Sequence, residues 1–228
     1  MKPEPERLVW DLPVRLTHWL LVLGVAGSWA SHYAGVEWFA WHRRFGYAVL
    51  VLVAFRIAWG FVGTRHARFR SFLRGPRAIL GYLRGVPAAD PAGHNPLGAL
   101  GVVALLVVLL AQAATGLFAN DEIMNAGPFY GWIDPALSNR ITSVHRLLSD
   151  GLLTLIAVHV LAVAWHVLAR RRPLLRAMLT GRKPAALVPP QEMIAGSRTA
   201  VALVIVAALA AALALVLRVA PEATIALF

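Results

Sequence analysis

Runs of about 20 apolar residues recur along the sequence from near its N-terminus to near its C-terminus. Because an α-helix rises about 1.5 Å per residue, a run of about 20 residues can cross a hydrocarbon core about 30 Å thick. Hydrophobicity that returns throughout the chain argues against a signal peptide followed by a soluble domain. The sequence therefore predicts an all-α integral membrane protein that crosses the membrane several times. The five runs are residues 16–35, 45–63, 97–118, 147–169 and 199–217.

Composition supports this assignment and restricts the cofactors. Of the 228 residues, 59% are hydrophobic and 14% are charged, whereas soluble domains have about 25% charged residues. The chain contains no cysteine, which excludes disulfides, thiolate metal sites, iron–sulfur clusters and covalently attached haem c. Thiolate ligands are therefore excluded, and we expect nitrogen or oxygen atoms to hold any cofactor metal.

The distribution of basic residues predicts the orientation, because cytoplasmic loops of membrane proteins are enriched in Lys and Arg. The formal net charge is +11, and basic residues are concentrated in segments 64–85 and 170–183. Segment 119–142 instead carries three acidic residues and one arginine. We expect the N-terminus and both basic segments inside, and segment 119–142 and the C-terminus outside. The charge then reflects topology and contact with anionic membrane lipid, not nucleic-acid binding.

Two segments differ from the rest. The external segment 119–142 contains several aromatic residues and prolines, and we expect a short interfacial helix and a docking surface there. The fifth run has no His, Trp or Gly and follows a proline-containing linker, 184–198. We therefore divide the chain into a four-helix core, residues 1–183, and a linker with an extra C-terminal transmembrane helix, residues 184–228.

Histidines in or beside the apolar runs are the candidate functional residues, since ionisable side chains are unfavourable inside a membrane. His145 and His159 are 14 positions apart in the fourth helix. This separation corresponds to a rotation of about 1400°, close to four full turns, and a rise of about 21 Å. One helix face thus presents imidazoles at two depths, whereas a proton relay would need steps of one or two turns.

Depth pairs these two histidines with histidines of the first two helices. His18, near the inner end of the first helix, matches His159, and His42, at the outer start of the second, matches His145. Two imidazoles on opposite faces of a flat macrocycle complete the coordination of haem iron, and helix bundles supply such facing side chains. We therefore predict a four-helix transmembrane bundle that holds two b haems, plus the fifth helix.

Glycines are consistent with these sites. Gly46 follows His42 by one turn on the same helix face and leaves room for a broad ring. Gly24 and Gly27 in the first helix either make room in the same way or allow two helices to pack closely.

Arginines are candidate partners of the haem propionates. Arg56 follows His42 by 14 positions and so shares its helix face at the inner depth. Arg43, Arg44 and Arg146 are candidates at the outer depth.

Three further histidines leave alternatives open. His32 could replace His42 as an outer ligand, and His166, seven positions beyond His159, could be the inner ligand instead. His94, at the inner start of the third helix, is either a helix cap or a hydrogen-bonding partner for a quinone carbonyl.

Four stretches resemble the bacterial di-haem cytochrome b family that contains cytochrome b561 and the b-type cytochrome subunits of nickel–iron hydrogenases, over residues 8–183. The resemblance implies that His18, His42, His145 and His159 are the axial ligands of two b haems. It also implies a multi-pass protein of the bacterial inner membrane, with its N-terminus cytoplasmic and its C-terminus periplasmic. The stretches are WDLPVRLTHWLL (10–21), HRRFGYAVLVLVAFRIAWGFVG (42–63), GHNPLGAL (93–100) and SVHRLLSDGLLTLIAVHV (143–160).

These observations predict an electron-transfer cytochrome b of the respiratory chain. It would connect the quinone pool with a periplasmic redox partner, such as a c-type cytochrome, a hydrogenase or another dehydrogenase, in either direction. We expect an electron-transfer subunit and assign no catalytic residue; a homo-oligomer is compatible with the sequence. One alternative is a superoxide:quinone oxidoreductase of the same fold. Another is a haem-free transporter, which would need carboxylates beside the imidazoles, where Asp150 is the only clear one.

Overall fold

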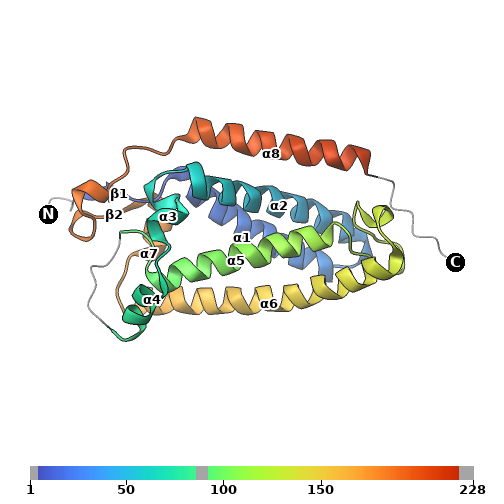
Figure 1. The fold of residues 1–228 in the computed structure, drawn as a ribbon, viewed down its shortest axis with the longest axis horizontal. Coiled ribbons are helices and arrows are strands. Elements are labelled where there is room, and N and C mark those ends of the chain that lie inside the picture. The colour runs from blue at the N-terminus through green and yellow to red at the C-terminus, as the bar shows by residue number, and fades with distance from the viewer. Residues whose placement is uncertain (1–4, 86–91, 221–228) are drawn as a thin grey trace. The chain divides into compact units, whose positions relative to one another are not determined.

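A computed structural model describes residues 5–85 and 92–220 of the chain. The last eight residues of the predicted C-terminal segment lie outside the described residues. The long helices, shown in Figure 1, are α1 (Leu12–Tyr33), α2 (Phe39–Val62), α5 (Pro96–Gly116), α6 (Pro135–Leu168) and α8 (Thr199–Val219).

Four helices in the described part of the chain are long and apolar enough to cross a membrane. They are α2 with the 3₁₀ turn before it (together Val36–Val62), α5, α6 and α8. The prediction of a helical integral membrane protein is therefore confirmed.

Helix α1 contains most of the first predicted span, 16–35, but is not among these four. It carries two histidines, two tryptophans and two serines, which lower its hydropathy. Polar side chains of this kind are expected where a helix faces other helices and not lipid. That α1 crosses the membrane stays a prediction.

Helix α6 begins 12 residues before the predicted start of the fourth span, at Pro135 and not at 147. The Asp134 carboxylate accepts hydrogen bonds from the backbone N–H groups of Ala136 (2.8 Å) and Leu137 (3.3 Å). An acidic N-cap followed by proline is a typical helix start, but the polar first turns hide it from a hydropathy window. The described segment 119–142 contains no separate interfacial α-helix, but a 3₁₀ turn, Tyr130–Trp132, and the first turns of α6.

Shorter elements lie between the long helices. Residues 182–184 pair antiparallel with residues 6–8, so that Arg7 stands opposite Lys183. The short helices and strands are α3 (Phe69–Phe72), α4 (Pro76–Leu83), α7 (Leu174–Thr180), β1 (Glu6–Leu8) and β2 (Arg182–Pro184). The remaining 3₁₀ turns are Val36–Trp38, Arg65–Ala67, Ala185–Leu187 and Pro190–Glu192.

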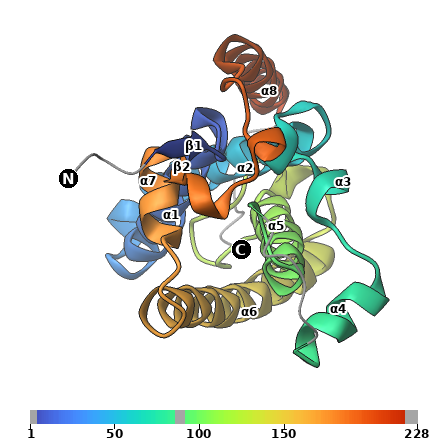
Figure 2. The same ribbon diagram turned by 90° about the vertical axis from the view of Figure 1, so that its left-hand side faces the viewer.

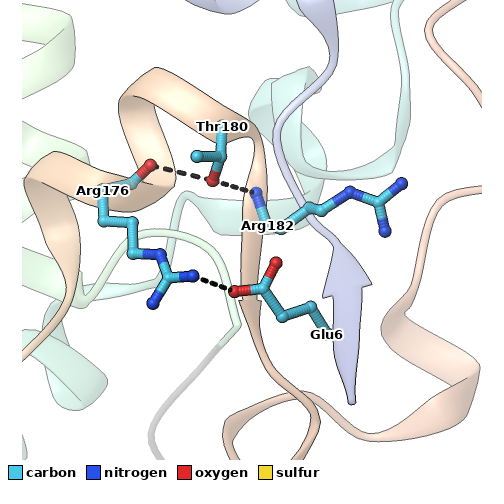
Figure 3. Close-up of polar contacts among 4 residues, drawn as sticks. All are labelled: Glu6, Arg176, Thr180 and Arg182. Carbon is cyan, nitrogen blue, oxygen red and sulfur yellow. Dashed lines mark hydrogen bonds and ion pairs between the residues drawn. The ribbon is translucent and has the colours of Figure 1, made fainter. Parts of the chain in front are cut away.

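Side chains reinforce the pairing of β1 with β2 (Figure 3). Arg176 on α7 forms an ion pair of 2.8 Å with Glu6 of β1. Thr180 Oγ1 donates a hydrogen bond to the Arg176 carbonyl (2.9 Å) and accepts one from the backbone N–H of Arg182 (3.2 Å). The backbone N–H of Ile194 donates to the Leu8 carbonyl (3.0 Å). The linker after the predicted core is thus held against the N-terminal strand.

Internal contacts divide the chain into two compact units. The first unit is Met1–His18, Arg56–Leu105 and Leu155–Leu203, and the second unit is Trp19–Phe55, Leu106–Thr154 and Val204–Phe228. Within each unit, segments of α1, α2, α5 and α6 lie side by side, as Figures 1 and 2 show. The site residues are described unit by unit below.

Candidate functional site

In the second unit, His42 of α2 and His145 of α6 face each other. Their ring centroids are 6.4 Å apart and the ring planes are inclined by 83°. Both side chains are half-buried. The structure therefore brings together the predicted outer pair of histidines.

Hydrogen bonds orient the His42 ring. Its Nδ1 atom lies 2.9 Å from the backbone carbonyl oxygen of Ser28 and 3.2 Å from the Ser28 hydroxyl. A carbonyl oxygen can only accept, so Nδ1 carries the hydrogen and Nε2 keeps its lone pair. Histidines that bind metals commonly fix their ring by such a bond to a backbone carbonyl.

His145 has the same arrangement. Its Nδ1 lies 3.0 Å from the Gln112 backbone carbonyl and 3.1 Å from the Thr115 hydroxyl. Its Nε2 lies 3.2 Å from the Gln112 side-chain nitrogen, which donates to it. Gln112 Oε1 is buried and has no hydrogen-bond partner among the described residues. The only hydrogen bond that His145 Nε2 accepts among the described residues thus comes from the side-chain amide of Gln112.

In the first unit, His18 of α1 and His159 of α6 also form a pair. Their ring centroids are again 6.4 Å apart, with the planes inclined by 53°. His18 is half-buried, whereas His159 is exposed. The predicted inner pair is therefore also brought together.

The distance within each pair fits two ligands of one metal. Two imidazoles that bind a metal from opposite sides, with metal–nitrogen bonds of about 2 Å, have ring centroids about 6.3 Å apart. The described residues contain no cluster of three or more His, Asp or Glu side chains able to hold a metal ion. A pair of histidines suits a metal that already has four ligands, as iron has in haem. The donor atoms present therefore fit a haem at each pair.

The two alternative ligands have different surroundings. The exposed His32 lies beside the second-unit pair, with its ring centroid 5.7 Å from that of His42, and stays an alternative. His166 is engaged elsewhere, because its Nδ1 donates to the Ala162 carbonyl (2.8 Å) and its Nε2 lies 3.4 Å from the side-chain nitrogen of Asn95. The contacts of the first unit favour His159 over His166.

The glycines separate into two kinds. A Cβ atom on Gly24 would come within 2.9 Å of Val49, and one on Gly27 within 2.6 Å of the Phe45 ring. These two glycines therefore allow α1 to pack closely on α2. A Cβ atom on Gly46 would meet no atom within 4 Å, so the space beside this glycine is compatible with a broad ring.

The four arginines predicted to bind haem propionates differ in burial. Arg56 is buried, and its Nη1 donates to the Ala67 carbonyl (3.2 Å). Arg146 is exposed, next to His145. Arg43 and Arg44 are exposed as well, with their guanidinium groups 5.8 Å and 4.8 Å from the ring centroids of Phe39 and Trp41. The role of all four toward propionates stays a prediction.

His94 lies between two aromatic rings in the first unit. Its ring centroid is 4.8 Å from those of Trp10 and Phe72, and its buried Nδ1 has no hydrogen-bond partner among the described residues. The helix cap is formed by Asn95, whose Oδ1 accepts a hydrogen bond from the backbone N–H of Gly98 (2.7 Å). His94 is thus not the cap of α5.

Burial and nearby cations keep His94 neutral. Burial, reinforced by the positive charges of Arg56 and Lys183, lowers the pKa of His94 to about 3. Burial also lowers the pKa of Lys183 to about 8, and its Nζ donates to the Ala92 carbonyl (2.7 Å). A neutral imidazole and an amine that titrates near neutral pH can together offer hydrogen bonds and a proton.

Asp11 is a buried residue that is not among the predicted site residues. Its Oδ1 accepts a hydrogen bond from the backbone N–H of Val14 (2.7 Å), which caps α1 seven residues before His18. Its Oδ2 accepts hydrogen bonds from Trp59 Nε1 (3.1 Å) and from the Thr64 hydroxyl. The Asp-Leu-Pro sequence at the helix start is the signal that could have identified this role.

Known proteins confirm the resemblance. A family model described as prokaryotic cytochrome b561 matches residues 9–181. Two relatives, each described as a probable Ni/Fe-hydrogenase B-type cytochrome subunit, come from Azotobacter chroococcum mcd 1 and Azotobacter vinelandii. Both are 27% identical to the chain over 210 residues, which cover 76% of this chain and 86% of each relative. No solved structure matches the chain.

Proposed function

The chain belongs to the prokaryotic cytochrome b561 family, and from this premise we propose that it carries electrons between a periplasmic redox partner and the quinone pool by means of two b haems. Family membership makes it a transmembrane b-type cytochrome of electron transport that binds haem b. When bound, a b haem supplies an iron that takes up and releases one electron. The observation that carries the proposal is the pair of facing imidazoles, 6.4 Å apart, in each unit.

The proposed ligands are His42 with His145, and His18 with His159. In the second unit, both histidines donate their Nδ1 hydrogen to a backbone carbonyl, which leaves Nε2 unprotonated. These Nε2 atoms would hold the iron, after the Gln112 side chain leaves that of His145. Helix α6 contributes one ligand to each haem, so a single helix fixes part of both sites. Of the predicted propionate partners, Arg56 is proposed for the inner haem and Arg146 for the outer haem.

A quinone site is proposed at His94. Its neutral imidazole offers a buried, unpartnered Nδ1 to a quinone carbonyl. The positive charges of Arg56 and Lys183 act on this imidazole and would stabilise negative charge on a reduced quinone oxygen. Lys183, with a pKa of about 8, holds a proton at Nζ that it can release near neutral pH.

The proposed orientation places the N-terminus in the cytoplasm and the C-terminus in the periplasm of a bacterial inner membrane. The segment between α5 and α6, within the predicted docking surface 119–142, would then face the periplasm. It exposes the apolar side chains of Ile123, Met124 and Trp132, which a partner protein can cover. Because both relatives are described as hydrogenase subunits, a hydrogenase is the proposed partner, with a c-type cytochrome or another dehydrogenase as the next candidates.

The proposed division of the chain places the cytochrome core in residues 1–183 and the linker with the extra helix in residues 184–228. It is supported by the family match, which ends at residue 181. Helix α8 is apolar and long enough to span the membrane, and it lies beyond the matched region.

The haem content of the purified protein tests the proposal. We expect two b haems per chain from a pyridine haemochrome assay and a reduced-minus-oxidised spectrum. The variants His145→Ala and His159→Ala should each retain one haem. The matched variants His32→Ala and His166→Ala should retain two. Fewer than two haems per chain in the wild type, or loss of haem from either matched variant, would contradict the ligand assignment.

A further inference from the structure

Five arginines surround two adjoining hollows in the first unit. One hollow has a volume of about 540 Å³ and is lined by Arg65, Arg68, Arg70 and Arg74, together with Ser71. The other has a volume of about 490 Å³, and its charged lining residues are Arg65, Arg68 and Arg198. Because Arg65 and Arg68 line both hollows, the five side chains form one basic site, called here the arginine site.

No carboxylate within the described residues forms an ion pair with the arginine site. Arg65 Nη1 donates to the Gln191 carbonyl (2.9 Å), and Arg198 Nη1 donates to the Val62 carbonyl (2.7 Å). These two bonds fix the guanidinium groups and leave most of their donors free, since each guanidinium has several N–H groups. The Nε atom of Arg68 is buried and has no hydrogen-bond partner among the described residues. The site thus has an excess of positive charge and of donors, which an oxyanion would satisfy.

Guanidinium geometry suits oxyanions that accept two parallel hydrogen bonds, and both carboxylate and phosphate are of this kind. The planar fork of arginine donates two parallel hydrogen bonds to a phosphate group, and such charged bonds are about twice as strong as neutral ones. Two hollows that share two arginines can hold two phosphate groups. Of the two groups, phosphate is the one that phospholipid headgroups carry, as a diester, and two diesters can be joined in one molecule.

The place of the site in the fold selects a lipid over a soluble phosphate. Four of the arginines follow the end of α2 at Val62, and Arg198 directly precedes the start of α8 at Thr199. Both helices are long and apolar enough to span the membrane. The neighbouring side chains of Phe61 and Leu203 are 70% and 65% exposed, so acyl chains can cover them. Basic groups at the cytoplasmic end of membrane helices attract anionic headgroups.

We propose that the arginine site binds the phosphate groups of an anionic phospholipid, with a preference for a headgroup that carries two phosphates. Such a lipid would bridge the residues after α2 and the residue before α8. The lipid then has a structural role, because it joins the extra C-terminal helix to the end of a core helix. The site is separate from the histidine pairs and does not depend on the proposed electron-transfer function.

Native mass spectrometry of the delipidated, full-length protein tests the proposal. The probes are cardiolipin, phosphatidylglycerol, phosphatidylcholine and inorganic phosphate. We expect bound cardiolipin to exceed phosphatidylglycerol and both to exceed phosphatidylcholine. In Arg68→Gln/Arg70→Gln, cardiolipin binding should fall at least tenfold, whereas Arg77→Gln/Arg84→Gln, which removes two nearby arginines outside the hollows, should bind as the wild type does.

Two further measurements keep the result interpretable. The exposed pair Arg70→Gln/Arg74→Gln gives a second test if the change at Arg68 prevents folding, which the visible spectrum of the bound haem reports. Equal binding of all three lipids would overturn the proposal. So would an equal loss of cardiolipin binding in Arg68→Gln/Arg70→Gln and in the control Arg77→Gln/Arg84→Gln. Displacement of cardiolipin by millimolar inorganic phosphate would assign the site to free phosphate and would overturn the lipid assignment.

Discussion

His42 and His145 stand 6.4 Å apart, centroid to centroid, and each donates its Nδ1 hydrogen to a backbone carbonyl. The two carbonyls belong to Ser28 on α1 and Gln112 on α5. Four helices of the second unit thus define one site, two by carrying the imidazoles and two by orienting them. Such backbone bonds fix the ring tautomer without depending on which side chain occupies the supporting position.

Substitution of Gly116 should displace His145. A Cβ atom at this position would lie 3.0 Å from His145 Cε1, so the branched side chain in Gly116→Val would displace the ring from its position opposite His42. We expect the purified variant to contain one b haem per chain where the wild type has two. Gly151→Val is the matched control, because a Cβ atom on the exposed Gly151 of α6 meets nothing within 4 Å. Two haems in the Gly116 variant would contradict the expected displacement of His145.

Gly46 and Gly27 should respond differently to a large side chain. In Gly46→Phe the new ring would fill the space proposed for the haem, so we expect loss of one haem with little change in helix packing. In Gly27→Phe the ring would collide with Phe45, so both the haem content and the thermal unfolding temperature should fall. Haem assay and thermal unfolding, measured on the same preparations, separate the two effects. Two haems per chain in Gly46→Phe would contradict the proposal that this glycine leaves space for a haem.

The glycines show what sequence can and cannot predict about the site. Helix periodicity places His145 and His159 on one face, and this regularity made the pairing with His42 and His18 predictable. The same periodicity could not tell that Gly24 and Gly27 pack against α2 while Gly46 faces open space. That difference depends on which side chains of a neighbouring helix point toward each glycine.

Contacts between segments far apart in the sequence could not be predicted either. The pairing of Arg7 with Lys183 joins residues 176 positions apart, and no local pattern indicates it. The start of α6 at Pro135 and the cap by Asn95 were encoded locally, in an Asp-Pro and an Asn-Pro sequence. Hydropathy alone overlooks these signals because capping residues are polar, whereas the four candidate membrane spans in the described residues follow directly from it.

Loss of the Asp11 carboxylate should destabilise the first unit. Asp11→Ala would leave Trp59 Nε1 and the Thr64 hydroxyl without this acceptor and would remove the cap of α1. We expect a loss of about 2–4 kcal/mol in the free energy of unfolding. Asp150→Asn, at an exposed position of α6, should change it by less than about 0.5 kcal/mol. Thermal and denaturant unfolding followed by circular dichroism measure both, and equal effects of the two changes would contradict the assigned role.

The His94 imidazole should make the protein sensitive to acid. Its pKa is about 3 in the folded protein and about 6.5 in an unfolded chain. Between these values the unfolded state binds a proton that the folded state does not, so stability falls as the pH is lowered below about 6.5. From pH 7 to pH 5 the expected contribution is about 2 kcal/mol. His94→Gln lacks this titration, so its unfolding temperature should fall less over the same pH range than that of the wild type. Parallel pH profiles for the two proteins would show that His94 is protonated as readily in the folded protein as in the unfolded chain.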